Sequence, residues 1–336
     1  MLPENNPHVN KLLQAWLVIA FPWAALDAGH SQATPTHPPE ASMFDLHNQL
    51  DVIEKDVVYK TASGLDWQCR IHMPAQPGKH PWPMLLDVHG GGWNRFDRTR
   101  DGPVDQQLAA LGMVVASVDF RLNGQAPHPA AMQDIHSAVR WLKAHAADFD
   151  ATPEGMGALG FSSGGHQVLM AGMRPDHAAY GSADAGAHNA ALAYLICSGC
   201  GYDLITAMTE QSPVAPHKYD HFNLYGYMGG VEGVRGESPL HVIQTQETLA
   251  TPPLLLIQAG ADVLPGFTND KAAAFAQLYT QRGGQVELAI LAGAPHIFIN
   301  PGLMPDSEAM RRGLAMLKGF IARQLAYQAH PFAPPR

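Results

Sequence analysis

The chain has 336 residues, of which 46% are hydrophobic and 15% charged, so it can bury a sizeable core and is not a disordered polyelectrolyte. Its 21 Lys and Arg against 30 Asp and Glu give a net charge of −9 at pH 7. A chain of this charge repels a phosphate backbone, so we expect no nucleic-acid partner.

The N-terminus contains an apolar segment, residues 12–26 (LLQAWLVIAFPWAAL). It is shorter than the roughly 20 residues that cross a bilayer, so we predict no membrane span. Only one lysine precedes it and no Ala-x-Ala cleavage site follows it, which favours an N-terminal helix over a signal peptide. Residues 31–42 (SQATPTHPPEAS) are then a proline-rich linker.

We therefore divide the chain into residues 1–50, an apolar helix and linker that caps the body, and residues 51–330, the main domain. Three cysteines are too few for a disulfide framework and suit a reducing compartment, which predicts a cytoplasmic protein. Export is the alternative if residues 11–28 are a signal peptide.

Short apolar runs alternate with helical patterns from Asp51 onward. The predicted strands are residues 53–60, 65–73, 83–88, 113–120, 157–161, 191–198, 253–258 and 286–291. The first two form a hairpin, and the later ones are near-continuous apolar runs, as parallel strands buried on both faces require. This alternation predicts an α/β fold: a doubly wound, mostly parallel eight-stranded sheet with helices on both faces.

Two further segments complete this outline. Helical spacing of apolar residues marks residues 132–142 and 310–321. Residues 202–246 are rich in Tyr, Gly and Pro and lack a period, so we interpret them as a small lid insertion.

The segment Gly160-Phe161-Ser162-Ser163-Gly164 matches G-x-S-x-G between a predicted strand and a helix-compatible stretch. In that context the motif forms a strained turn that exposes the serine hydroxyl as a nucleophile. Ser162 stands at the centre of the motif, and Ser163 is the rival.

A serine hydroxyl needs a base and an acid that orients the base. In the chain order Ser, acid, His, Asp262 follows the strand ending at Gln258 and His296 follows the strand ending at Leu291. Both lie beyond the carboxyl ends of strands, where ligands bind in such sheets. Asp270 competes with Asp262 but falls within the next predicted helix.

The segment His89-Gly90-Gly91-Gly92-Trp93 directly follows another predicted strand. Runs of glycine of this type bring backbone N–H groups close to a developing oxyanion. A phosphate-binding loop is the alternative, but neither a following Lys-Ser/Thr nor a G-x-G-x-x-G pattern accompanies it.

With these motifs in this order, the chain resembles the hormone-sensitive-lipase-like and feruloyl-esterase-like carboxylesterases of the α/β-hydrolase superfamily. The resemblance runs from about residue 56 to residue 325. It implies ester hydrolysis through an acyl-enzyme without a cofactor. Ser162 would be the nucleophile, His296 the general base and Asp262 its orienting acid, and the amides of Gly91, Gly92 and Ser163 would form the oxyanion hole.

The substrate pocket is expected between the insertion and the residues beside these motifs, namely Trp93, Phe267, Ile297 and Phe298. The expected partner is a small-molecule ester of small to medium acyl length. Although the chain has 18 histidines, no HExxH or paired Cys/His spacing organises them, so we predict no metal.

Two other functions remain open. An arylformamidase-like amide hydrolase would use the same triad, and a non-catalytic ligand-binding protein could be built on the same fold. The sequence also leaves the oligomeric state open, with a homodimer as one alternative.

Overall fold

The computed structural model describes residues 44–62, 64–181, 188–218, 220–245, 248–304 and 306–329. The predicted N-terminal helix, its role as a cap, and the alternative signal peptide concern residues outside this part of the chain.

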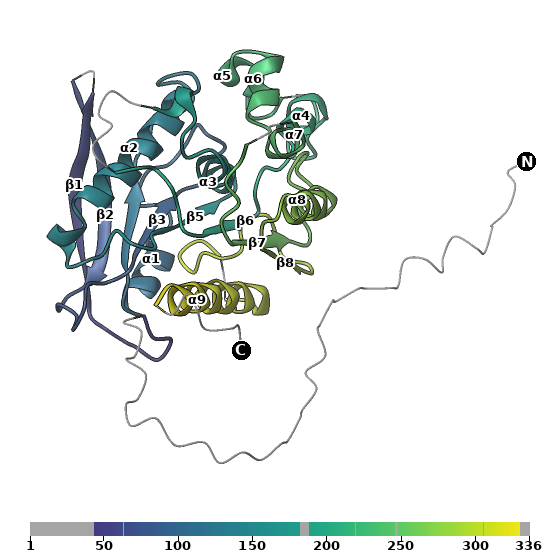
Figure 1. The fold of residues 1–336 in the computed structure, drawn as a ribbon. Helices are drawn as coiled ribbons and strands as arrows, with labels where there is room; N and C mark the ends of the chain where they lie inside the picture. Colours follow the sequence, from purple (N-terminus) through teal and green to yellow (C-terminus); the bar gives the residue numbers. More distant parts are fainter. Residues whose placement is uncertain are drawn as a thin grey trace, which may run out of the picture. The chain divides into compact units, whose positions relative to one another are not determined.

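In the described part, eight strands form one sheet in the order β1-β2-β4-β3-β5-β6-β7-β8 (Figure 1). The strands are β1 (Val52–Ala62), β2 (Leu65–Pro74), β3 (Met84–Val88), β4 (Val114–Val118), β5 (Gly157–Phe161), β6 (Leu195–Ser198), β7 (Leu254–Ala259) and β8 (Val286–Leu291). β2 is antiparallel to both of its neighbours, β1 and β4, and the remaining pairs are parallel. The predicted fold class is confirmed.

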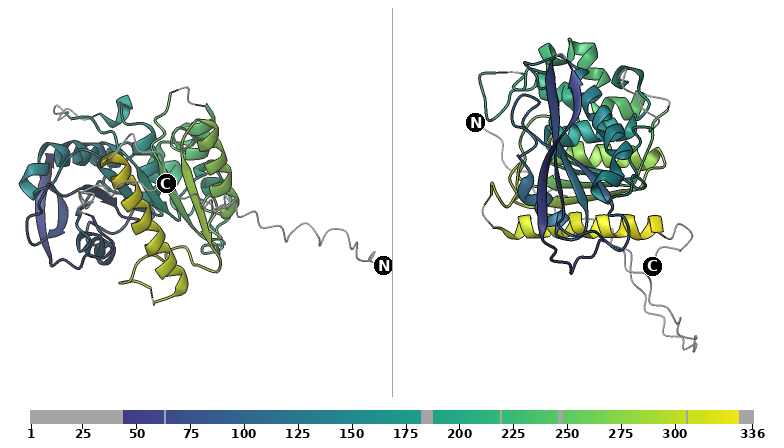
Figure 2. Two further views of the ribbon diagram at one scale, coloured as in Figure 1. Left: turned by 60° about the horizontal axis from the view of Figure 1, so that its bottom comes forward. Right: turned by 90° about the vertical axis from the view of Figure 1, so that its left-hand side faces the viewer.

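Helices cover both faces of the sheet, as Figures 1 and 2 show. They are α1 (Gly102–Ala109), α2 (Ala130–Ala144), α3 (Ser163–Met173), α4 (Leu204–Thr209), α5 (Leu224–Met228), α6 (Val231–Gly236), α7 (Pro239–Thr245), α8 (Asn269–Gln281) and α9 (Glu308–Ala329). Helices α2, α3 and α8 share one hydrophobic core with one face of the strands, and α1 and α9 share a second core with the opposite face. The central strands β3 to β6 are buried along their whole length because both faces are covered.

Two elements differ from the sequence prediction. The sixth strand begins at Leu195 rather than at residue 191, because residues 191–194 approach it as irregular chain. The insertion contains the four helices α4 to α7, of five to seven residues each. Helices of fewer than two turns leave too few repeats for a periodic pattern to be recognised.

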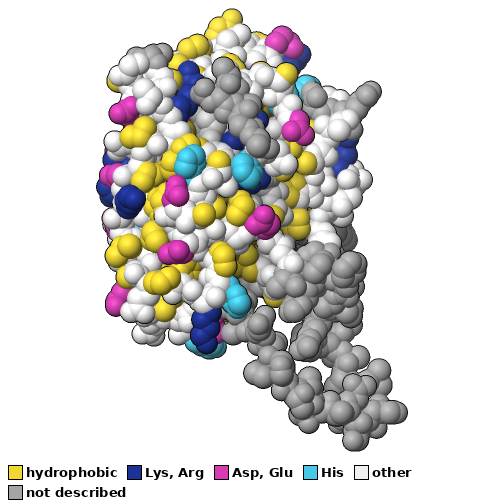
Figure 3. Space-filling model, turned by 60° about the vertical axis from the view of Figure 1, so that its left-hand side comes forward, with side chains coloured by type: hydrophobic (Ala, Val, Ile, Leu, Met, Phe, Trp, Pro, Cys, Tyr) yellow, Lys and Arg dark blue, Asp and Glu magenta, His cyan; other side chains and the backbone are white. Residues whose placement is uncertain are grey.

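The surface carries mixed charge. On the face drawn in Figure 3, Lys and Arg side chains are interspersed with Asp and Glu rather than gathered into one region. Within the described residues, no helix has the length and apolar character needed to cross a bilayer.

Candidate active site

Ser162 lies in a sharp turn between β5 and α3, with φ of +53° and ψ of −120°. A non-glycine residue at positive φ is strained by about 1–3 kcal/mol, so the surrounding packing must hold it there. The two glycines of the motif allow that packing, because neighbouring backbone comes closer to them than a Cβ atom would permit. A Cβ at Gly160 would lie 2.6 Å from the carbonyl carbon of Gly164, and a Cβ at Gly164 would overlap the carbonyl oxygen of Val88.

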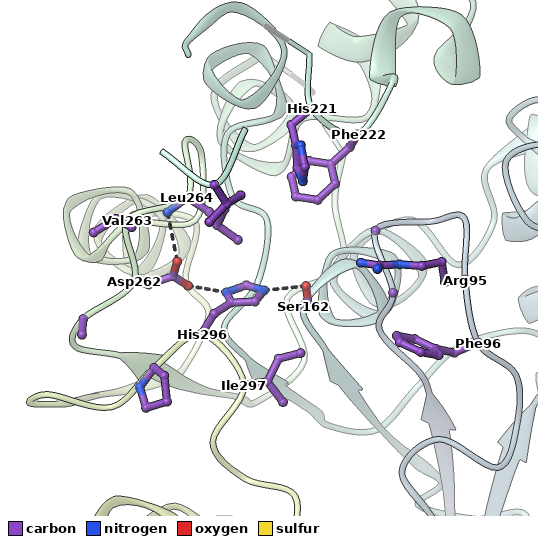
Figure 4. A pocket seen from close by; sticks show the side chains of 15 residues that line it. Arg95, Phe96, Ser162, His221, Phe222, Asp262, Val263, Leu264, His296 and Ile297 are labelled. Atoms are coloured by element: carbon purple, nitrogen blue, oxygen red, sulfur yellow. Dashed lines mark hydrogen bonds and ion pairs between the residues drawn. The ribbon is translucent and has the colours of Figure 1, made fainter. Parts of the chain in front are cut away.

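The structure brings the three predicted triad residues together in one hydrogen-bonded chain (Figure 4). Nε2 of His296 lies 2.8 Å from Oγ of Ser162, and Nδ1 lies 2.5 Å from Oδ2 of Asp262. A carboxylate can only accept, so Nδ1 carries the ring proton and Nε2 is free to accept from the serine hydroxyl.

The competing acid lies elsewhere. Asp270 stands in the first turn of α8 and accepts a hydrogen bond from Oγ1 of Thr268 at 2.6 Å. Asp262 is buried, and its second oxygen accepts the N–H of Leu264 at 3.1 Å. The geometry therefore pairs His296 with Asp262 and leaves Asp270 in the first turn of α8.

The glycine-rich loop after β3 adopts backbone conformations that need glycine. Gly91 has φ of +129° and Gly92 has φ of +63°, and a Cβ at Gly92 would lie 3.0 Å from the ring of Phe222. Among the described residues, the N–H groups of Gly91, Gly92 and Ser163 donate to no backbone acceptor outside regular helix and strand pairing. These three amides are free to bind a ligand oxygen.

The loop and helix α3 are joined by hydrogen bonds from Trp93. Its backbone N–H donates to Oγ of Ser163 at 3.3 Å, and its indole Nε1 donates to Nδ1 of His166 at 3.2 Å. Nε2 of His166 in turn lies 2.8 Å from the carbonyl oxygen of Glu237. Sequence reasoning did not identify His166 or Glu237, since neither falls in a motif.

A cavity of about 380 Å³ opens over Ser162. Its lining residues come from the glycine-rich loop, the insertion, and the loops after β7 and β8: Gly91, Gly92, Arg95, Phe96, Ser162, Val214, His221, Phe222, Ala261, Asp262, Val263, Leu264, Pro295, His296 and Ile297. Most of these were missed because they lie in loops without a periodic pattern.

The predicted pocket wall requires correction. Ile297 lines the cavity, but Trp93, Phe267 and Phe298 do not. Trp93 and Phe267 pack beneath Phe222, whose ring centroid is 5.3 Å and 5.6 Å from theirs, in the small core of the insertion. Phe298 belongs to the core beside α9. Large aromatic side chains gain most when fully buried, so they support the wall from behind instead of forming it.

The chain is similar to known esterases. The family model BD-FAE matches residues 69–265. Carboxylesterase NlhH of Mycobacterium tuberculosis is 28% identical over 325 residues, which cover 94% of this chain and 96% of that protein. Esterase LipI of the same species is 26% identical, with 73% and 75% covered.

Solved structures share the fold. The native structure of the esterase Est2 from Thermogutta terrifontis has a TM-score of 0.66 at 24% identity and covers 80% of this chain and 91% of its own. The form of that enzyme phosphonylated by sarin has a TM-score of 0.67 at 23% identity, with 84% and 96% covered.

The eight-stranded sheet and the serine turn define an α/β-hydrolase. The chain belongs to the BD-FAE family, and it is a carboxylic ester hydrolase.

Proposed function

We propose that the chain hydrolyses small to medium acyl esters through a covalent acyl-enzyme formed on Ser162. The observation that carries the proposal is the unbroken hydrogen-bonded chain Ser162–His296–Asp262 in the lining of a cavity. Beside it are three backbone amides that donate to no backbone acceptor of the described residues outside regular helix and strand pairing.

In the first step, Oγ of Ser162 attacks the ester carbonyl carbon while Nε2 of His296 takes the hydroxyl proton. The oxyanion of the tetrahedral intermediate accepts hydrogen bonds from the amides of Gly91, Gly92 and Ser163. The carboxylate of Asp262 stabilises the imidazolium without taking its proton. The ester C–O bond then breaks, and His296 returns the proton to the leaving alcohol.

Water completes the cycle. It attacks the acyl-enzyme as His296 takes one of its protons, the bond to Oγ breaks, and the proton returns to Ser162 as the carboxylic acid departs. These steps need only the side chains and amides described, so we propose no cofactor.

The size of the cavity favours short acyl chains. Its volume of about 380 Å³ lies near the lower end of ligand pockets, which span roughly 300–1,000 Å³. Phe222, Leu264 and Ile297 supply apolar wall. Each buried methylene adds about 0.8 kcal/mol until the space is full, after which overpacking opposes binding.

The test is kcat/KM for p-nitrophenyl esters with acyl chains of two to sixteen carbons. We expect the value to rise from acetyl to about butyryl or hexanoyl and then to fall steeply. An optimum at the palmitoyl ester would contradict the small cavity. The same series on a chain lacking residues 1–42 tests the proposed cap, because a cap that encloses the cavity makes the optimum broaden when it is removed.

The alternative functions give different results in the same assay. Faster turnover of N-formylkynurenine than of every ester would favour the arylformamidase-like reaction. Binding of esters without turnover would favour the ligand-binding protein. For location we propose the cytoplasm, because Cys69, Cys197 and Cys200 are buried and unpaired thiols.

A further inference from the structure

One cationic side chain lines the cavity over Ser162 without an ion-pair partner among the described residues. Among its described lining residues, Asp262 alone is acidic, and both of its oxygens are occupied, by His296 and by the N–H of Leu264. Arg95 is the one Lys or Arg in that lining, and it forms no ion pair within 4.0 Å with any described residue. By contrast, Arg98, three residues further along the loop, forms ion pairs with both Asp56 and Asp119.

The fold places Arg95 at one side of the cavity. Its carbonyl oxygen packs so closely on Gly91 that a Cβ there would overlap it, which fixes the backbone of the loop. Its guanidinium carbon lies 5.5 Å from the ring centroid of Phe96. In Figure 4 the guanidinium group points into the cavity, and Ser162 lies between it and His296. A group bound by Arg95 would thus lie on the side of Ser162 away from the triad base.

The side chains next to Arg95 add a hydrogen-bonding group to the cavity and leave the guanidinium without an acidic partner. His221 lines the cavity and also an adjoining hollow that it shares with Asn94, Arg95 and Phe222. Burial and the charges of Lys218 and Arg95 lower the pKa of His221, so at neutral pH it is an uncharged hydrogen-bonding group. The nearest acid in sequence, Asp220, is committed to the backbone N–H groups of Leu224 and Tyr225.

We infer that Arg95 binds a carboxylate of the substrate, so that the preferred substrates are esters carrying a second, anionic carboxylate group. A guanidinium presents two parallel N–H donors, which bind the two oxygens of a carboxylate in a planar, bidentate arrangement. The inference rests on the proposed hydrolysis at Ser162 and specifies its substrate class. The carboxylate can belong to the acyl part, as in a half-ester of a dicarboxylic acid, or to the alcohol part.

Two matched pairs of esters distinguish these sources. For the acyl part, 4-nitrophenyl hydrogen adipate is compared with 4-nitrophenyl hexanoate. For the alcohol part, 4-acetoxybenzoate is compared with its methyl ester. We expect kcat/KM to favour the anionic member in at least one pair, and the preference to shrink as salt rises from 0.05 to 0.5 M, since charge attraction at an open site is screened.

The variant Arg95→Gln keeps a long polar side chain and removes the charge. In the pair that shows the preference, we expect the ratio of kcat/KM for the anionic ester to that for the neutral ester to fall about tenfold, as is typical when a charge-assisted hydrogen bond is lost. In Arg95→Lys this ratio should fall less, because lysine keeps the positive charge although it cannot form the bidentate pair.

The matched control is Arg312→Gln. The side chain of Arg312 on α9 is 61% exposed, and its guanidinium lies 3.9 Å from the carboxylate of Glu308. It removes one positive charge from the molecule outside the cavity, so the ratio should equal that of the parent chain.

The outcomes separate the two proposals. If the parent chain prefers the neutral ester in both pairs, or if Arg95→Gln leaves the ratio unchanged while both esters are turned over, the inference on Arg95 is wrong and ester hydrolysis stands. If none of the four esters is hydrolysed, the proposed function itself fails.

Discussion

Asp262 fixes the imidazole of His296 through a short bond from Nδ1, and its own position is fixed by the N–H of Leu264. Only 1% of its side chain is exposed. Its role follows from this geometry: the carboxylate selects the ring tautomer that leaves Nε2 unprotonated toward Ser162.

The first prediction concerns the acid. We expect Asp262→Asn to lower kcat by about 10⁴-fold, because the amide cannot hold the required tautomer or stabilise the imidazolium. Asp270→Asn is the matched control, with its side chain at the start of α8. The measurement is kcat for p-nitrophenyl butyrate, and the reverse ranking of the two variants would assign the acid to Asp270.

The second prediction separates the two adjacent serines. Ser162→Ala should remove more than about 99% of turnover, in line with the losses when a triad member is deleted. Ser163→Ala keeps the backbone amide and loses one acceptor for the N–H of Trp93. Loss of a neutral hydrogen bond corresponds to about 1 kcal/mol, so kcat should fall about fivefold. Loss of turnover in Ser163→Ala together with retained turnover in Ser162→Ala would contradict the assignment of Ser162 as the nucleophile.

Among the residues of the candidate active site, the sequence predicted those that belong to recognisable motifs. Ser162, Asp262 and His296 were identifiable because each follows a recognisable strand in a fixed order. Arg95 and His221 were not, because they reach the cavity only through the conformations of their loops.

Helix α3 joins the glycine-rich loop to the insertion. His166, buried in α3, has its pKa lowered to about 4 by burial, so its ring is neutral at physiological pH. Nδ1 accepts from the indole of Trp93, so the proton is on Nε2 and is donated to the carbonyl of Glu237. The carboxylate of Glu237 accepts the hydroxyl of Tyr180 at 2.6 Å and lies 3.4 Å from Arg174.

The third prediction tests this connection. His166→Leu leaves two buried partners without a hydrogen bond, at about 1–3 kcal/mol each. We expect a lower melting temperature and a kcat that falls for every ester, while KM changes little, because the oxyanion loop loses its support. His166→Gln can both accept and donate, so it should recover most of kcat. An unchanged kcat in His166→Leu would show that the bond does not position the loop.

Strands were more predictable than the insertion for a physical reason. The parallel strands β3 to β7 are buried on both faces, so each appears in the sequence as an apolar run of nearly its own length. The insertion is held by a small core around Leu204, Leu224 and Phe267. These residues are far apart in sequence, and only tertiary contacts bring them together.

Three buried carboxyl groups, on β3, on α1 and at the N-cap residue of α1, affect the molecule as a whole. Asp87, Asp101 and Asp105 lie within the sheet–helix layer, and burial raises the pKa of each; for Asp101 the value is about 6. Asp105 accepts the hydroxyl of Ser117 at 2.5 Å, and Asp101 accepts the side-chain amide of Asn300 at 2.9 Å. Ionising this cluster opposes folding.

The fourth prediction follows for Asp101→Asn, which retains an acceptor for Asn300. The folded pKa of Asp101 lies above its ordinary value of 3.8. Its contribution to stability is therefore complete below pH 3.8 and is lost as pH rises through about 6. The free energy of unfolding of the variant minus that of the parent should be larger at pH 8 than at pH 4, by on the order of 1–3 kcal/mol. Urea denaturation at both pH values measures it, and an equal difference at both would contradict the account.

The central claim is that Ser162 becomes covalently acylated, and a fluorophosphonate probe followed by peptide mapping tests it most directly. The account predicts one adduct per chain, located on Ser162, with loss of ester turnover in proportion to labelling and no adduct in Ser162→Ala. An adduct on Ser163, or full turnover of p-nitrophenyl butyrate by a chain labelled on Ser162, would contradict it.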